Sequence, residues 1–366
     1  MDPGTALKKR LPHIDLLKCL AIYFVLLFHG ALYPLGIWPE MPPSMLVRYF
    51  SRTILSACVP LFFFASGYLM LSRPLDLKKH TLRTLKFLLL TCFWTVFLLL
   101  LLQPYYQEFF SLKELKGHIW DMRIGWNNHL WYLGVLIGIY LVLPVLKAAF
   151  DGNRASFFWF TAVMAVLVFG RNTIDLGMTL FNLFVKQEFY LYSTSFPLFS
   201  QYTPFTYTAA LGLAYFCLGG TAWALEEYLL RIRALWRNGA AIVGIVLCCA
   251  VLGILGWRFS LYLKDLWDVV WNGYYTVFTL GNVLCLYLLS LNLKRDIPFL
   301  RLISSNTLGI YLVHDLLLKA TGPVISEFDF MRTLPGTVVY ATAMLLMTLA
   351  ACLILRRIPL VRHVIS

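Results

Sequence analysis

Long apolar segments recur along the whole chain and are separated by short polar connections. A helix needs about 20 mainly apolar residues to cross a bilayer, and ten segments approach or reach that length. The pattern predicts an all-α, polytopic transmembrane helix bundle of about ten helices, forming a single domain over residues 1–366. The predicted spans are 14–36, 47–71, 85–103, 128–147, 156–170, 204–222, 239–257, 270–292, 302–320 and 336–355.

Composition agrees with this pattern. Hydrophobic residues make up 60% of the chain and charged residues only 13%, against about 25% charged residues in soluble domains. The net charge of +13 is expected from Lys and Arg retained in cytoplasmic loops, so we expect no nucleic-acid partner. With ten spans, the positions of these basic residues favour both termini in the cytoplasm.

Cysteine spacing gives no support for a metal site or a disulfide framework. The eight cysteines fall in or beside apolar segments and show no CxxC spacing. We therefore expect buried free thiols and no bound metal.

The first apolar segment carries three ionisable residues on one face. Lys18 and His29 are eleven residues apart, which is only about 20° past three full helical turns and about 16 Å along the axis. Asp15 lies about 40° from the same line. Because ionisable groups in hydrocarbon each cost about 3 kcal/mol, we expect this stripe to line a polar cavity with a function.

A late segment supplies a second membrane imidazole. Tyr311 lies about one turn before His314, on the same helical face, and Asn306 precedes both. The sequence therefore predicts a site drawn from the first and ninth spans. A purely structural hydrogen bond between helices is the alternative interpretation.

Three other segments have both a functional and a structural interpretation. Ser66 and its neighbouring glycine interrupt a bulky run, which lets a ligand or another helix approach the backbone. Arg83 and Lys86 face the same way and suit phosphate binding, or ordinary positive-inside topology. His129 and Trp131 open the fourth span, where they suit either a site at the membrane interface or an aromatic anchor.

The segment 171–203 is rich in aromatic and hydroxyl residues. It suits sugar binding, although an interfacial aromatic belt is the favoured interpretation.

Taken in order, these segments resemble the acyltransferase 3 family of integral membrane acyltransferases. In that family the first helix carries a basic residue, ten intervening residues and then a histidine. Lys86 departs from the family's Arg-x-x-Arg pair, because lysine keeps the charge but loses the bidentate fork. The matching segments are Lys18 to His29, Pro60 to Tyr68, Arg83 with Lys86, His129 to Leu133, and Leu308 to His314.

The resemblance implies transfer of an acyl group, often acetyl, from a cytoplasmic acyl-CoA donor to a hydroxyl of a cell-envelope glycan or lipid-linked saccharide. The implied location is the bacterial inner membrane. Acetyl-CoA is the expected acyl donor, and the bilayer is the expected surroundings.

The implied roles divide the candidate residues into three groups. His29, His314, Tyr311 and Asp15 are the catalytic candidates, with His29 acting as general base or as a transient acyl carrier. Lys18, Arg83 and Lys86 are the candidates for donor binding, and Ser66, His129, Trp131 and Asn306 are the candidates for substrate binding. A proton-coupled transporter or flippase of a saccharide or lipid-linked substrate is the alternative function.

Overall fold

The computed structural model describes residues 10–32, 43–106, 129–186 and 205–358, together with Ser111, Lys113, Lys116 and Gly117. Most of 104–127 and the aromatic stretch 187–204 lie outside the described residues.

The described chain is built from helices, with no strand among these residues. Nine of its helices are long and apolar enough to cross a membrane, and a tenth apolar helix, α11, is shorter. The long helices and α11 confirm the predicted all-α bundle. In order the elements are α1 Pro12–His29, α2 Pro43–Ser51, η1 Thr53–Ala57, α3 Cys58–Leu71, α4 Leu77–Tyr106, α6 Trp131–Gly152, α7 Arg154–Lys186, α9 Tyr207–Arg231, α10 Ala234–Leu263, η3 Asn272–Tyr275, α11 Val277–Ser290, α12 Pro298–Ile325, η4 Asp329–Arg332 and α13 Leu334–Leu355.

Several predicted spans differ in their bounds from the observed helices: α1 ends at His29 and not at residue 36, α4 begins at Leu77 and not at 85, and α9 ends at Arg231 and not at 222. Three other spans are interrupted, lengthened or shortened. The second span is broken: α2 and the 3₁₀ segment η1 precede α3. The fifth span, predicted to end at residue 170, continues as α7 to Lys186. The eighth span was predicted from residue 270, but its first residues form the turn η3 before α11 begins at Val277. Hydrophobicity alone does not distinguish these turns from helix.

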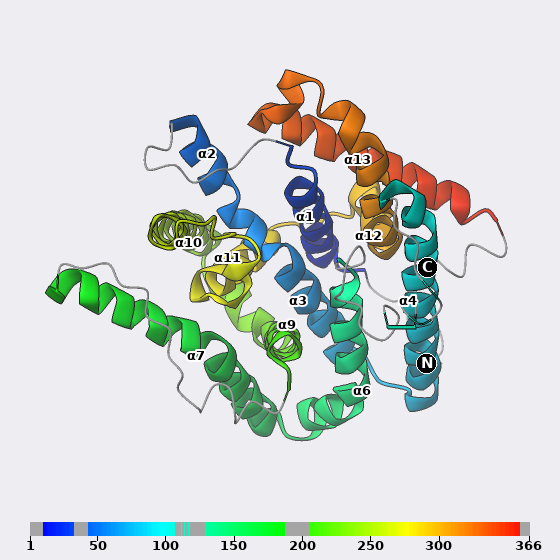
Figure 1. The fold of residues 1–366 in the computed structure, drawn as a ribbon. Coiled ribbons are helices and arrows are strands. Elements are labelled where there is room, and N and C mark those ends of the chain that lie inside the picture. Colours follow the sequence, from blue (N-terminus) through cyan, green and yellow to red (C-terminus); the bar gives the residue numbers. More distant parts are fainter. Residues whose placement is uncertain are drawn as a thin grey trace.

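Helix α1 occupies the middle of the bundle. It packs against α3, α11, α12 and α13. In Figure 1 α4, α6, α7 and α10 lie around the sides of this group, and α13 forms its upper edge. Contacts near both ends of α1 fall on α12: Lys18 contacts Ser304, and His29 contacts His314. The two helices therefore run parallel, so residues from the first and ninth predicted spans share one interface.

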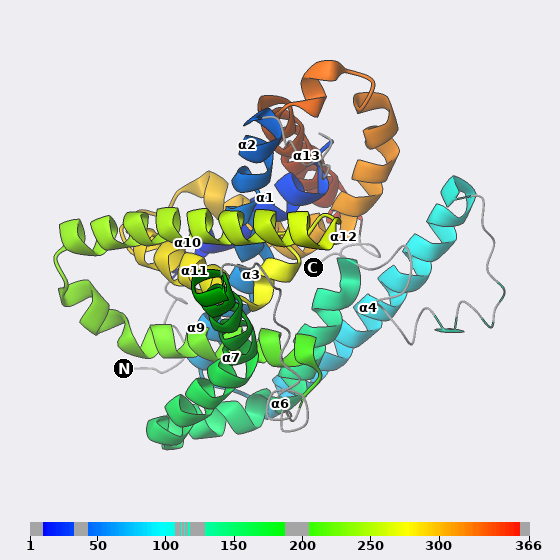
Figure 2. The ribbon, with the colours of Figure 1, turned by 60° about the vertical axis from the view of Figure 1, so that its left-hand side comes forward.

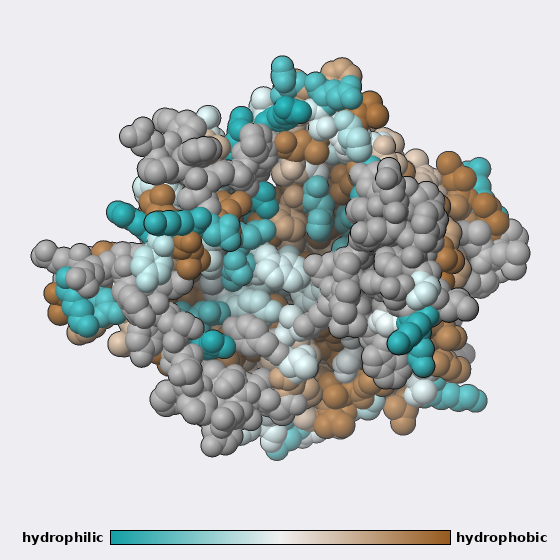
Figure 3. Space-filling view, in the orientation of Figure 1, coloured by the Kyte–Doolittle hydropathy of each residue, from teal (hydrophilic) through white to brown (hydrophobic). Residues whose placement is uncertain are grey.

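Helices α9 and α10 are seen nearly end-on in Figure 1 and lengthwise in Figure 2, where α4 projects from the opposite side of the bundle. Helix α10 packs along α11, and α4 contacts α6. The outward faces of α4, α7, α10 and α13 expose large apolar side chains, as expected for surfaces that contact lipid. Figure 3 shows hydrophobic surface near the edge of one face and pale to hydrophilic surface in its hollowed middle.

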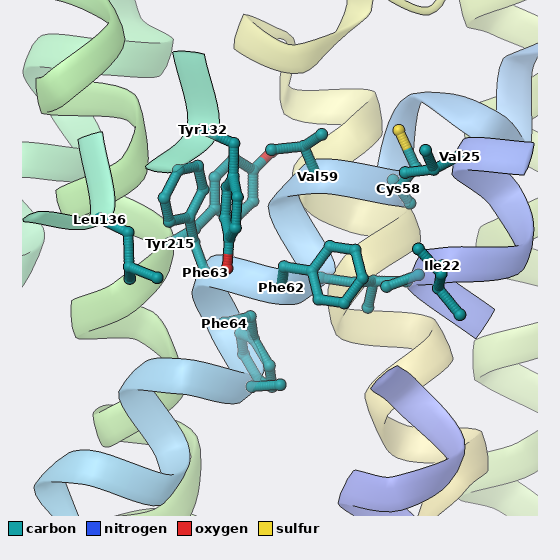
Figure 4. Packing of buried hydrophobic residues seen from close by; sticks show 14 of the residues in the cluster. Ile22, Val25, Cys58, Val59, Phe62, Phe63, Phe64, Tyr132, Leu136 and Tyr215 are labelled. Carbon is teal, nitrogen blue, oxygen red and sulfur yellow. The ribbon is translucent and has the colours of Figure 1, made fainter. Parts of the chain in front are cut away.

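Helix α3 is the most tightly packed element near the site. A Cβ atom at Gly67 would lie 1.8 Å from the carbonyl oxygen of Phe216 in α9, so only glycine permits this approach. Figure 4 shows the three consecutive phenylalanines of α3. Phe62 and Phe63 both pack against the Tyr132 ring of α6, with centroids 5.7 and 4.8 Å away, and Phe64 packs against Tyr287 of α11. Gly67 therefore serves helix packing, while the adjacent Ser66 remains available to a cavity.

Candidate active site

A cavity of about 970 Å³ opens between α1, α3, α4, α6 and α12. Its polar lining comes mainly from the start of α4, the connection before it and the first half of α1. Its apolar lining includes Phe62, Leu69 and Leu136. Such a mixed lining suits a ligand that has both a charged part and an apolar part.

One end of the cavity carries four cations, Lys18, Arg73, Lys79 and Arg83, here called the basic mouth. The single carboxylate among the lining residues, Asp76, pairs with Lys79 at 3.2 Å. Hydrogen bonding to Lys79 lowers the pKa of Asp76. Neither Arg73 nor Arg83 forms an ion pair within the described chain, so the mouth retains an excess of positive charge for an anionic ligand.

Lys18 and Asp15 are both held against α12 at Ser304. The Lys18 ammonium donates to the Ser304 carbonyl oxygen at 2.5 Å, and the Ser304 hydroxyl donates to Asp15 at 2.5 Å. Arg10 also binds the Asp15 carboxylate at 2.7 Å. Lys18 lines the cavity, whereas Asp15 lies about 21 Å along α1 from His29. The structure therefore places Asp15 beside Lys18 and away from the histidines.

Tyr311 also lines the cavity, about 10 Å along α12 from Ser304, which binds Lys18 of the basic mouth. It lines the cavity together with Ser66 and Tyr132, and the Tyr132 and Tyr311 rings are 5.5 Å apart. The Tyr311 hydroxyl donates a short hydrogen bond to the backbone carbonyl of His129. Tyr311 thus connects the cavity wall to the backbone of a candidate histidine.

Three imidazoles meet beside Tyr311: His29, His129 and His314, here called the histidine cluster. The His314 ring lies 5.4 Å from that of His29 and 5.6 Å from that of His129. His314 is completely buried and His129 is buried, whereas His29 is exposed. His29 is therefore the member of the cluster that an external substrate reaches most directly.

An ion pair supports the cluster from α12. Lys319 donates to the Asp315 carboxylate at 2.6 Å, and the same carboxylate oxygen lies 3.6 Å from Nδ1 of His129. On the other ring, Nδ1 of His314 lies 2.5 Å from the Tyr311 carbonyl oxygen, the distance of a donated hydrogen bond. With Nδ1 carrying the proton, Nε2 of His314 is left as an acceptor.

Several buried polar atoms of this region have no hydrogen-bond partner in the described chain. They include Nε2 of His129, Nε2 of His314 and Oδ1 of Asn306. Unsatisfied buried polar atoms are uncommon, and a catalytic role is one of the explanations for them. Asn306 itself is anchored through Nδ2, which donates to the Leu302 carbonyl oxygen at 2.7 Å.

The remaining predicted residues are more dispersed. Lys86 is exposed on α4 and does not line the cavity, unlike Arg83 one turn earlier. Trp131 is buried and packs against Trp271 with ring centroids 5.4 Å apart. Trp131 therefore lies two residues beyond the histidine cluster, in an aromatic group of its own.

Sequence analysis did not single out Asp315, Lys319, Arg73 or Tyr132. Asp315 directly follows His314, and Lys319 is four residues later on the same helix. Such an acidic–basic pair inside a membrane helix is itself a marker of a polar site. The positions of Arg73 and Tyr132 on the cavity wall depend on packing between helices and leave no mark in the sequence.

Within the described part of the chain, no group of three His, Cys, Asp or Glu side chains suits a metal ion. All eight cysteines are free thiols; four are buried and four are partly exposed.

The chain belongs to the acyltransferase 3 family: residues 11–357 match the family described as an acyltransferase domain. No curated protein and no solved structure matches the chain. Fold and family together define a multi-pass membrane acyltransferase.

Proposed function

We propose that this chain transfers an acetyl group from cytoplasmic acetyl-CoA to a hydroxyl of a cell-envelope glycan or lipid-linked saccharide. The observation that carries the proposal is the cavity that joins the basic mouth to Tyr311, with the histidine cluster directly beyond. A donor with a polyanionic head and an acyl thioester tail matches this order of charged and apolar surface.

The donor is expected to bind with its phosphates at Arg73, Arg83 and Lys18. Guanidinium groups bind phosphate through paired, charge-assisted hydrogen bonds, and Lys18 is already anchored by Ser304. The pantetheine arm would then follow the apolar wall towards Ser66 and Tyr132. This places the thioester near Tyr311, at the border of the histidine cluster.

The acceptor hydroxyl is expected to lose its proton to a ring nitrogen of His29. The resulting oxygen nucleophile attacks the thioester carbonyl carbon and forms the new C–O bond. The C–S bond then breaks, and the CoA sulfur leaves and takes up a proton. The unpaired Nε2 of His314 would accept or pass on a proton. The Tyr311 hydroxyl would stabilise the negative charge on the carbonyl oxygen if it turned its hydrogen bond from the His129 carbonyl to that oxygen.

A second route uses the same residues and differs in its intermediate. His29 attacks the thioester itself, CoA leaves, and the acetyl-imidazole then transfers its acetyl group to the acceptor hydroxyl. A covalent acetyl-His29 trapped without acceptor would identify this route, whereas the direct route forms none.

The proposed location is the bacterial inner membrane, with both termini in the cytoplasm. In that orientation the basic mouth faces the cytoplasmic donor, and the end of α1 that carries His29 faces outward. From the order of its segments we also propose a likeness to the enterobacterial common antigen O-acetyltransferase, and a glycan acceptor would follow from that likeness. A proton-coupled transporter or flippase is not favoured by the family match.

Donor binding is tested by thermal denaturation of the purified, detergent-solubilised protein with and without CoA. A ligand present at about 100 times its Kd stabilises the folded state by about 2.7 kcal/mol. We expect CoA to raise the denaturation temperature and acetyl-CoA to label the glycan fraction of membranes that contain the chain. A protein that neither responds to CoA nor labels glycan would contradict the proposal.

A further inference from the structure

We propose that Trp271, Asp268 and Arg52 form the acceptor subsite, which holds one pyranose unit of a saccharide beside His29. This inference rests on the proposed function and names the part of the molecule that recognises its acceptor. The three residues come from the connection between α10 and α11 and from the junction of α2 with η1.

Trp271 is exposed but held in one place. Its side chain is 39% exposed, while its ring lies 5.4 Å from the buried ring of Trp131 and 5.7 Å from that of Tyr274. An aromatic ring fixed from behind, with a free face, is preorganised to bind an apolar surface. The C–H-rich face of a pyranose ring supplies such a surface, and its C–H bonds are attracted by the negative π face.

Asp268 both shapes this connection and presents a free acceptor. Its Oδ1 accepts hydrogen bonds from the backbone amides of Val270 at 2.9 Å and Trp271 at 3.2 Å. These bonds fix the turn that carries the indole. Its Oδ2 lies 3.9 Å from the Arg52 guanidinium, which is longer than a hydrogen bond, and the Asp268 side chain is 37% exposed. Oδ2 can therefore accept a hydrogen bond from a sugar hydroxyl.

Arg52 lies between the connection that carries Trp271 and the imidazole of His29. Its guanidinium carbon lies 5.0 Å from the centroid of the Phe28 ring, and the Phe28 and His29 rings are 4.9 Å apart. On the other side, Trp131, on which Trp271 packs, lies two residues after His129 of the histidine cluster. Contacts through Phe28 and through Trp131 therefore connect the proposed subsite to the histidine cluster.

The chemistry of these groups defines the class of acceptor. A carboxylate accepts hydrogen bonds from hydroxyls, a guanidinium donates to hydroxyl or carbonyl oxygens, and an aromatic face covers the sugar ring. Together they fit a pyranose with adjacent hydroxyl groups, one of which points towards His29. A lipid or a thiol acceptor offers no such combination.

The test uses the full chain in membranes, radiolabelled acetyl-CoA and the lipid-linked glycan fraction extracted from the same cells. For Trp271→Ala we expect the apparent KM for the glycan fraction to rise about tenfold, as loss of about 1.4 kcal/mol would give. Trp271→Phe should retain most of the affinity. Trp236→Ala removes a more exposed tryptophan of α10 and serves as the matched control, with an unchanged KM.

Asp268→Asn is the second variant, because an asparagine Oδ1 still accepts the two turn-forming amide bonds while the charge is lost. It should also raise the KM for glycan, and both variants should keep the KM for acetyl-CoA and the thermal response to CoA. If both variants match Trp236→Ala, the subsite is wrong even though the wild type labels glycan. If the wild type shows no CoA response and no label, the proposed function fails instead.

Discussion

The imidazole rings of His29 and His314 lie 5.4 Å apart, although the residues stand near opposite ends of the sequence. They meet because α1 and α12 run parallel and in contact, with Lys18 and Ser304 bound to each other nearer the start of both helices. One helix pair therefore aligns the basic mouth with the histidine cluster, and Tyr311 of α12 lies between them.

Removal of the Tyr311 hydroxyl tests whether this group, which lies between the cavity and the histidine cluster, takes part in catalysis. In Tyr311→Phe the ring remains and the hydrogen bond to the His129 carbonyl is lost. We expect kcat to fall by about tenfold, equivalent to loss of about 1.4 kcal/mol. The KM for acetyl-CoA should stay the same, because the basic mouth is untouched. An unchanged kcat would remove the hydroxyl from the mechanism.

The two basic residues predicted for donor binding are separated by the structure. Arg83 lines the cavity and Lys86 does not. We expect Arg83→Ala to weaken CoA binding by about tenfold, a loss of about 1.4 kcal/mol. Lys86→Ala is the matched control and should have a much smaller effect. Calorimetric titration of the purified variants with CoA measures both, and equal losses would show that the mouth extends beyond the cavity described above.

The close contact of α3 with α9 predicts a steric effect at Gly67. Gly67→Ala would place a methyl group 1.8 Å from the Phe216 carbonyl oxygen, at a cost of about 1–3 kcal/mol or separation of the helices. Gly138→Ala is the control, because no heavy atom lies within 4 Å of its added methyl group. Thermal denaturation in detergent should show destabilisation only for Gly67→Ala, and equal stability of both variants would contradict this packing.

A half-buried carboxylate joins four helices near the start of α1. Glu226 accepts hydrogen bonds from Tyr68 and, at 3.1 Å, from Tyr287, and lies 3.4 Å from the His13 ring nitrogen. Glu226→Ala removes the shared acceptor, while Tyr287 keeps a bond to the Ala222 carbonyl oxygen and Tyr68 keeps its contact with His13. We therefore expect stability to fall by about 1 kcal/mol. The adjacent, exposed Glu227 provides the control. A Glu227→Ala variant that is equally destabilised would show that the effect comes from the helix and not from the contacts.

Hydrophobic patterning was sufficient to predict the helices, because the bilayer imposes a minimum length on apolar segments. It did not predict where a span is interrupted. The break before α3 follows Arg52 and Thr53, and the turn at η3 contains the turn-forming pair Asn272-Gly273. The apolar residues on either side of these short polar signals made each segment read as one continuous span. Element type was therefore more predictable than element boundaries.

The candidate site was predictable in part. Helical spacing placed Lys18 and His29 on one face, and both contact α12. The same spacing linked Asp15 to His29, but their separation along α1 keeps them apart, and Arg10 and Ser304 bind the carboxylate instead. Periodicity gives the direction of a side chain and says nothing of its partner.

Residues from other helices were the harder part. Arg73 and Tyr132 reach the cavity only through the packing of α4 and α6 against the central helices. Trp271 lies in a connection whose sequence resembles an ordinary interfacial aromatic segment. Its distinguishing feature is the support from Trp131 and Tyr274, which exists only in three dimensions.

In the proposed mechanism His29 performs acyl transfer at the end of the donor cavity. The most direct measurement supplies radiolabelled acetyl-CoA to the cytoplasmic face of inverted membrane vesicles and follows label into the lipid-linked glycan. Wild-type vesicles should label glycan, whereas His29→Ala should not, while CoA still stabilises the variant against heat. His29→Ala vesicles that label glycan at the wild-type rate would show that His29 takes no part in acyl transfer.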